Sequence, residues 1–374
     1  MNHEVVIIGG GLAGLTAAIH LAKYDKKVLV IEKNHYPNHK VCGEYVSNEV
    51  RPYLNYLGVA IEQHTTVAID TLEISTRTGK SIKTKLPLGG FGISRYALDE
   101  LLYKKALEHK VSFLFDTVTN VDFHTDRFEI ETTQNGNFES GYVLGAYGKR
   151  SLLDKKLERK FIAHKSPWLG VKCHYDAKDF PDNLVALHNF DGGYGGLSKT
   201  ETGAINFCYL TTFESFRKFP DISGFNKMVV GENPLLAEFL ENAEPLFKKP
   251  LSIAQISFEP KEPVEKHVLM CGDSAGLIHP LCGNGMAMAI HSGKIAAEQI
   301  LQHESTVKST RADLEKSYTI QWKRQFDHRL WMGRQLQRLL MNSTSANIAM
   351  NTVARSEKIL RSMIRRTHGK PILV

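Results

Sequence analysis

The segment HEVVIIGGGLAGLTAAIHLAKYDKKVLVIEK, residues 3–33, decides the fold. It begins with an unbroken apolar run at residues 5–8, which is typical of a parallel strand buried on both faces. A second apolar run at residues 28–31 ends in Glu32, and the residues between the runs are typical of a helix. The order strand, glycine-rich turn, helix, strand predicts an α/β fold with a parallel sheet.

The turn after the first strand has the spacing G-x-G-x-x-G, with glycines at Gly9, Gly11 and Gly14. Gly9 permits a tight turn, Gly11 lets a pyrophosphate approach the backbone, and Gly14 lets the helix pack closely on the strand. The helix N-terminus offers its unpaired N–H groups and its positive dipole end to phosphates. Glu32 is placed to accept hydrogen bonds from a ribose 2′-hydroxyl, which disfavours a 2′-phosphate. The segment therefore predicts a Rossmann-like domain that binds FAD or NAD.

A distant segment favours FAD. The stretch CGDSAGLIHPLCGNGMAMAI, residues 271–290, follows a short apolar strand, begins a helix, and contains no charged side chain after Asp273. Here the sequence resembles the flavoprotein family of aromatic hydroxylases and geranylgeranyl reductases. The resemblance implies that Gly272 and Asp273 contact the ribityl chain of FAD. A helix N-terminus beside the flavin can stabilise the anionic reduced ring, as it stabilises other anions.

Other segments agree with the resemblance. It implies a P-x-x-G-x-G loop beside the isoalloxazine ring, a loop close to the flavin at residues 40–47, and an arginine that reaches back to the FAD phosphates before a helix. The alternative for the arginine is a surface salt bridge. The predicted cofactor-binding residues are Gly9, Gly11, Leu12, Ala13, Gly14, Glu32, Lys33, Cys42, Gly43, Arg95, Gly272, Asp273, Pro280, Gly283, Asn284, Gly285 and Met286.

One segment departs from the family pattern. Many hydroxylases have GADG where this chain has GAYGKRS, residues 145–151, so Tyr147 stands in the place of an aspartate. In the family this segment serves both FAD packing and access of NAD(P)H. NAD(P)H is therefore a candidate electron donor whose direct use is in doubt.

The two halves of the predicted cofactor site lie far apart in the chain, so we expect a discontinuous FAD-binding domain of the glutathione-reductase type. Hairpins are predicted around residues 78–79 and 135–136, and alternating strand-like stretches at residues 168–258. The expected FAD-binding domain comprises residues 1–60, 95–160 and 263–305. The expected β-rich substrate domain comprises residues 61–94 and 161–262, and residues 306–374 are expected to form a C-terminal helical cap.

Three residues are candidate catalytic groups. Lys172 and His174 alternate on one predicted strand and so share a face. A histidine could act as a general base toward a phenol, and a lysine could hold the phenolate. The alternative is that both belong to the polar face of a sheet. Cys42, near the predicted flavin, is either reactive or a small buried hydrophobe.

The resemblance implies an FAD-dependent oxidoreductase. The first expectation is a monooxygenase of secondary metabolism that hydroxylates an aromatic or polyketide-like lipophilic substrate through a flavin C4a-hydroperoxide. The second is a reductase that saturates isoprenoid double bonds, although residues 196–198 lack the tryptophan and Phe-Pro usual in those enzymes. A halogenase is a further option, but its W-x-W-x-I-P box is absent. A flavin-binding electron carrier is disfavoured, because the β-rich region would roof the flavin.

Composition limits the partners. The 374 residues carry a formal net charge of +7, and the five cysteines are scattered, without a C-x-x-C pair or a His-rich tract. We therefore expect no disulfide framework, no metal site, no nucleic-acid partner and a cytoplasmic location. The basic tail at residues 311–370 is either a solvated helical face or an amphipathic surface that contacts anionic lipid. The sequence leaves the oligomeric state open.

Overall fold

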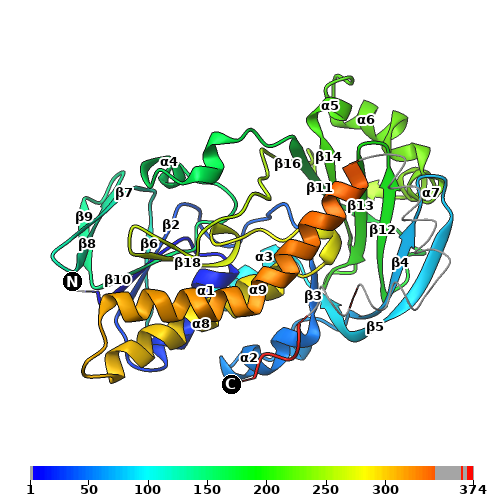
Figure 1. Ribbon diagram of the computed structural model, residues 1–374. Coiled ribbons are helices and arrows are strands. Elements are labelled where there is room, and N and C mark those ends of the chain that lie inside the picture. The colour runs from blue at the N-terminus through cyan, green and yellow to red at the C-terminus, as the bar shows by residue number, and fades with distance from the viewer. Residues whose placement is uncertain (1–2, 342–363, 365–368, 374) are drawn as a thin grey trace.

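The computed structural model describes residues 3–341, 364 and 369–373, with the backbone alone described for residues 336–341. The first layer is a six-stranded sheet, parallel except for its β17–β18 edge (Figure 1). Its strands, in spatial order, are β17 (Val264–Glu265), β18 (Val268–Met270), β10 (Tyr142–Gly145), β1 (Val5–Ile8), β2 (Val28–Glu32) and β6 (Ser112–Phe115). Strands β1 and β2 are buried along their whole length, as their unbroken apolar runs predicted.

Long helices cover this sheet. Helix α1 (Leu12–Ala22) contacts α3 (Arg95–Glu108) and α8 (Gly285–Ser305), and α8 contacts α9 (Arg311–Met341). Glycine allows the close contact of α1 with α8, because a Cβ added at Gly293 would lie 2.4 Å from the carbonyl oxygen of Ala13. The start of α1 therefore lies against the middle of α8, although the two helices are far apart in sequence.

The second layer is a nine-stranded, mostly antiparallel sheet, which stands at the opposite side of the molecule in Figure 1. Its strands are β15 (Glu244–Pro245), β11 (Trp168–Asp176), β14 (Ile205–Thr212), β13 (Gly193–Lys199), β12 (Leu184–Phe190), β4 (Ala68–Ser75), β5 (Ser81–Gly92) and β3 (Tyr45–Ser47), and β16 (Leu251–Ala254) pairs with β11. The predicted hairpin around residues 78–79 joins β4 to β5 and is confirmed.

A three-stranded sheet is formed by β7 (Val118–His124), β8 (Arg127–Thr132) and β9 (Asn137–Ser140). The predicted hairpin around residues 135–136 joins β8 to β9, and this prediction is also confirmed. Short helices complete the connections: α2 (Arg51–Tyr56), α4 (Leu153–Lys156), α5 (Phe213–Phe216), α6 (Ile222–Met228) and α7 (Pro234–Asn242).

The predicted domain limits stay a prediction, but the sheets bear on them. Strand β3 lies within residues 1–60, yet it pairs with β5 of the large sheet, with Tyr45 opposite Gly92. The chain therefore crosses between the layers just after residues 40–44. Of the expected C-terminal helical region, the structure describes α9 as a helix, while residues 342–363 lie outside the described part.

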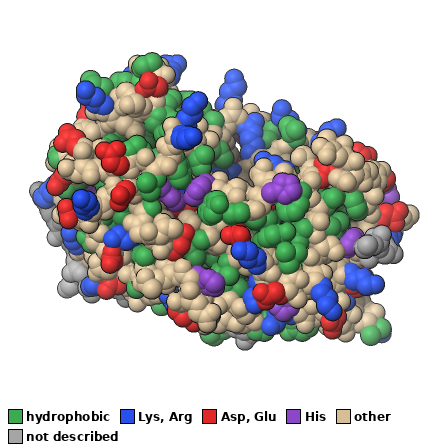
Figure 2. Space-filling model, turned by 180° about the vertical axis from the view of Figure 1, so that it is seen from behind, with side chains coloured by type: hydrophobic (Ala, Val, Ile, Leu, Met, Phe, Trp, Pro, Cys, Tyr) green, Lys and Arg blue, Asp and Glu red, His purple; other side chains and the backbone are tan. Residues whose placement is uncertain are grey.

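Two further properties concern the charge of the surface and the apolar character of the helices. Figure 2 shows basic and acidic side chains interspersed over one face of the molecule, with hydrophobic side chains between them. Within the described residues, no helix combines the length and the apolar character needed to cross a bilayer.

Candidate active site

The glycine turn after β1 has the geometry that its spacing predicted. Gly9 has a φ of +103°, and a Cβ there would lie 2.5 Å from the carbonyl oxygen of Ala146. A Cβ at Gly14 would lie 2.1 Å from the carbonyl oxygen of Gly9, so any side chain would push α1 away from the strand. Gly11 is the N-cap of α1, and no side chain caps the helix. The first N–H groups of α1 therefore stay available to a phosphate.

Glu32 ends β2, as expected, and holds the turn. Its buried carboxylate accepts hydrogen bonds from the main-chain N–H of Gly10 (2.8 Å) and of Asn34 (3.0 Å). Carboxylate oxygens have further lone pairs, so Glu32 can still accept a ribose hydroxyl. The neighbouring Lys33 is exposed and does not line the cavity that the turn faces.

Arg95 lines the cavity at the start of α3 and is held by an acid that the sequence reading missed. Its guanidinium makes a bidentate pair with Asp99, with both N–O distances at 2.7 Å, and Lys40 Nζ lies 2.7 Å from the same carboxylate. Burial opposes the charge of Asp99, but Arg95 and Lys40 outweigh it and lower the pKa of Asp99. An acid four residues after an arginine on a predicted helix is a pattern that could have pointed to Asp99.

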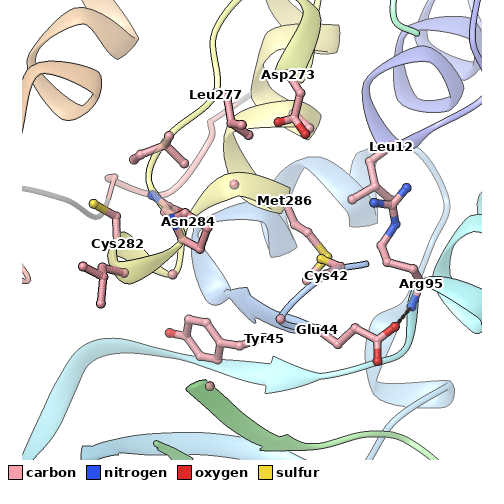
Figure 3. Close-up of a pocket in the computed structure, with 18 of the residues that line it drawn as sticks. Leu12, Cys42, Glu44, Tyr45, Arg95, Asp273, Leu277, Cys282, Asn284 and Met286 are labelled. Atoms are coloured by element: carbon pink, nitrogen blue, oxygen red, sulfur yellow. Dashed lines mark hydrogen bonds between the residues drawn. The ribbon is translucent and has the colours of Figure 1, made fainter. Parts of the chain in front are cut away.

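The second half of the site follows β18. Gly272 has a φ of +60°, and its N–H donates to Ser292 Oγ at 3.0 Å. Lys261 Nζ donates to the carbonyl oxygen of Asp273 at 2.7 Å, which fixes the backbone behind that side chain. Asp273 and Arg95 both border the cavity, and Figure 3 shows them on neighbouring sides of it.

The loop before α8 borders the same cavity. Gly283 adopts a left-handed conformation with a φ of +60°, and the helix starts two residues later with its N-terminus at the cavity. Figure 3 shows Met286 pointing into the space between this loop and Cys42. The predicted residues of this loop that line the cavity are Pro280, Gly283, Asn284, Gly285 and Met286.

The predicted catalytic pair lies behind the cavity wall. Lys172 and His174 share a face of β11, but neither lines the cavity, and both bind Glu44. Lys172 Nζ pairs with Glu44 Oε1, and His174 Nε2 lies 2.6 Å from Glu44 Oε2. Burial opposes the ionisation of Glu44, but the hydrogen bond from His174 and the charge of Lys172 lower its pKa.

A cluster with metal-ligating side chains surrounds this carboxylate. The nitrogen and oxygen ligand atoms of His39, Glu44 and His174 lie within 4.8 Å of one another. Both carboxylate oxygens already accept hydrogen bonds, and the Lys172 ammonium is paired with one of them. A divalent cation would place two further positive charges beside a buried ammonium, which is costly at low dielectric. The cluster is therefore an ion-pair network centred on Glu44.

Tyr147, the departure from the family pattern, is also bound inside the protein. Its hydroxyl donates to Asp154 Oδ1 at 3.0 Å, and Asp154 forms a buried ion pair with Arg159. Burial raises the pKa of Tyr147, so the phenol stays neutral. Tyr147 does not line the cavity, whereas Ala146, Gly148 and Lys149 beside it do.

The cavity has a volume of about 280 Å³ and continues from the glycine turn to the inner face of the large sheet. Its far wall is aliphatic. This wall consists of Leu72, Ile74, Leu86, Val185, Leu187, Leu197 and Ile364. Three cysteines, Cys42, Cys271 and Cys282, line the cavity, and burial raises the pKa of Cys271 and of Cys282 to about 12.

The residues present fit FAD. The glycine turn and the uncapped start of α1 suit a pyrophosphate, and Arg95 adds a positive charge beside them. The second helix start, of α8, suits the negative charge of a reduced flavin, and Asp273 suits hydroxyl groups between the two. Since all of these groups border one continuous cavity, one elongated dinucleotide can contact them together.

Comparisons with known proteins agree with this assignment. A model of the pyridine nucleotide-disulphide oxidoreductase family matches residues 3–158. Menaquinone reductase of Mycobacterium tuberculosis is 24% identical over 319 residues, which are 79% of this chain and 76% of that protein. Digeranylgeranylglycerophospholipid reductase 2 of Methanothermobacter thermautotrophicus is 24% identical over 362 residues, which are 91% of this chain and 86% of that protein.

Solved structures with the same fold include a flavin-dependent brominase, with a TM-score of 0.80 and 19% identity, covering 98% of this chain and 93% of that one. A geranylgeranyl bacteriochlorophyll reductase-like protein of Thermoplasma acidophilum has a TM-score of 0.78 and 17% identity, covering 98% and 95%. A halogenase solved with phloroglucinol and FAD has a TM-score of 0.75 and 14% identity, covering 97% and 85%. The fold, the site and these matches together identify the chain as an FAD-dependent oxidoreductase.

Proposed function

We propose that this enzyme is a reductase that saturates a carbon–carbon double bond in a lipophilic substrate of isoprenoid type. The observation that carries the proposal is the aliphatic far wall of the cavity, formed by strands β4, β5, β12 and β13 together with Ile364. A branched hydrocarbon chain gains about 25 cal/mol per Å² of apolar surface that it buries against such a wall. The names of two relatives, menaquinone reductase and digeranylgeranylglycerophospholipid reductase 2, agree with a lipid substrate.

The residues of this chain would bind and orient. The glycine turn, Arg95 and Asp273 would hold FAD, which supplies a hydride once it is bound and reduced. The aliphatic wall would hold the alkene at the end of the cavity formed by the large sheet and would exclude water from it. The start of α8 would stabilise negative charge on the reduced ring system.

A monooxygenase acting on a lipophilic molecule is the second candidate. The observation that favours it is the position of the cavity between the two layers, with its walls contributed by both, since oxygen transfer requires that water be kept from the reacting atoms. Activation of a phenol has less support, because Lys172 and His174 are paired with Glu44 and do not reach the cavity.

The product distinguishes the two candidates. The purified holoenzyme is reduced chemically without oxygen and is mixed with geranylgeraniol, and the products are analysed by mass spectrometry. The reductase predicts a product that has gained two hydrogen atoms, together with return of the flavin absorbance. No reaction without oxygen, followed by a product that contains one added oxygen atom when air is admitted, would replace the reductase with the monooxygenase. Addition of NADH or NADPH to the oxidised enzyme tests the electron donor by loss of flavin absorbance.

A further inference from the structure

Residues 40–44, which we call the clamp loop, have an unusual arrangement of main-chain hydrogen bonds. Each of the five successive carbonyl oxygens accepts a hydrogen bond from a different residue outside the loop. The donors are Lys172 Nζ to Lys40 (3.1 Å), Lys149 Nζ to Val41 (3.2 Å), Asn206 Nδ2 to Cys42 (3.1 Å), Ser198 Oγ to Gly43 (2.9 Å) and the Ile93 N–H to Glu44 (3.2 Å). All five carbonyl dipoles are therefore fixed by the surrounding protein.

The N–H groups of the clamp loop are in the opposite situation. Within the described part of the chain, the N–H groups of residues 41–44 have no hydrogen-bond acceptor, and these four residues line the cavity. Gly43 is exposed, but Glu44 is buried and Val41 and Cys42 are partly buried. Buried N–H groups are nearly always paired in folded proteins, so the N–H groups of these three residues indicate a missing acceptor. The loop thus keeps its acceptors engaged and its donors unpaired at the cofactor cavity.

The side chains that hold the loop form a row across the large sheet. Ser198 on β13 is opposite Asn206 on β14, and Asn206 is opposite His174 on β11. Ser198 and Asn206 are almost completely buried. Asn206 Oδ1 is buried without a partner, although Asn206 Nδ2 is bonded to the loop. An unpaired buried carbonyl oxygen destabilises a protein, which argues that the amide is retained for its donor.

Glu44 closes the arrangement at the end of the loop. It has a φ of +56°, a conformation that disfavours a side chain, and its carboxylate accepts a 2.7 Å hydrogen bond from the Arg95 N–H. Lys172 and His174 hold the same carboxylate. Lys172 therefore supports the loop twice, through the Glu44 side chain and through the carbonyl oxygen of Lys40.

We propose that Lys172, Asn206 and Ser198 are positioning residues for the flavin. They hold the carbonyl groups of the clamp loop away from the cavity, and the N–H groups of the loop then serve as donors to the electron-rich edge of the ring. A carbonyl turned into the cavity would instead repel the negative charge that develops on reduction. This proposal rests on the FAD site and on neither of the two substrate reactions. The product test above can therefore give either result without affecting it.

The test measures the midpoint reduction potential of the bound flavin in Asn206→Leu. The matched control is Asn233→Leu, which removes another buried asparagine, one whose Nδ2 donates to Ser75, Thr76 and Asn189 outside the clamp loop. We expect Asn206→Leu to weaken the preference for reduced flavin about tenfold, which is a potential about 30 mV lower for a two-electron couple. Asn233→Leu is expected to lower the thermal stability and to leave the potential unchanged.

Two further measurements keep the proposal falsifiable if Asn206→Leu does not fold. Ser198→Ala deletes one hydroxyl and is expected to lower the potential by a smaller amount. In the wild-type protein, amide hydrogen exchange at residues 41–44 is expected to slow when FAD binds. An unchanged potential in both clamp variants, an equal shift in the Asn233→Leu control, or amides that FAD does not protect would each overturn the proposal.

Discussion

The two halves of the cavity are built in different ways. The half at the glycine turn is formed by main-chain atoms and by buried charges, with clearances near Gly9 and Gly14 that no side chain fits. The half at the large sheet is formed by interchangeable aliphatic side chains such as Leu72 and Leu187. The cofactor half therefore depends on the positions of backbone atoms, whereas the substrate half depends on the total apolar area that its side chains offer. Substitutions in the cofactor half should therefore reduce stability and FAD binding, whereas substitutions in the substrate half should weaken binding of the substrate.

The largest effect is expected for Gly14→Ala. The added Cβ would lie 2.1 Å from the carbonyl oxygen of Gly9, so α1 must move away from β1. We expect a loss of about 3 kcal/mol in the free energy of unfolding and loss of bound FAD. Gly141→Ala is the control, because its nearest contact would be an ordinary 3.6 Å. Equal FAD content and equal melting temperatures in the two variants would show that the turn tolerates displacement.

Asp99→Asn should have the next largest effect. It removes the charge of the fully buried carboxylate that binds the partly buried guanidinium of Arg95 and also pairs with Lys40. Breaking a buried ion pair costs about 3 kcal/mol, and we expect a lower unfolding midpoint in urea and weaker FAD binding by titration. Glu100→Gln, which removes the carboxylate that pairs with the exposed Lys104 on the same helix, is expected to change stability by less than about 0.5 kcal/mol. A harmless Asp99→Asn variant would mean that Arg95 needs no anchor.

Leu187→Gln tests the substrate half of the cavity. The change places an amide in the aliphatic wall and removes about 1.5 kcal/mol of apolar contact, so KM for an isoprenoid alcohol should rise about tenfold. FAD content and reduction potential should stay at wild-type values, because Leu187 belongs to the far half. A loss of FAD in this variant would mean that the two halves are not separable.

The smallest effect concerns Lys261, which fixes the backbone of Asp273. Burial lowers the pKa of Lys261 from 10.5 to about 8 in the folded protein. Between these values the unfolded chain binds more protons, so this residue makes the free energy of unfolding rise as the pH increases through that window. Urea unfolding of the wild type and of Lys261→Met at pH values on both sides of 8 tests this. The free energy of unfolding of the wild type, relative to that of Lys261→Met, should rise with pH, and the absence of such a rise would contradict the assignment.

The cofactor half was largely predictable from local sequence. The glycine spacing and the uncharged segment at residues 271–290 both correspond to groups around one cavity, and Glu32, the acid that ends β2, binds the N–H of Gly10 in the turn. Lys33 was included by its position beside Glu32 and is instead exposed, because alternate residues at a strand end point to opposite sides. The catalytic interpretation of Lys172 and His174 rested on a shared strand face, which does not reveal what the face meets.

The sequence by itself determined the α/β fold class and the geometry of the glycine turn, because a tight turn and a closely packed helix start impose steric limits on neighbouring residues. Tertiary structure alone decided that Glu44 receives Lys172 and His174, that Asn206 and Ser198 hold the clamp loop, and that Ile364 joins strands of the large sheet in one apolar wall. The separation in sequence across these hydrogen bonds runs from 128 residues for Glu44 and Lys172 to 164 residues for Cys42 and Asn206. Such pairings depend on strand order and register in the sheet, which no local pattern of residues specifies.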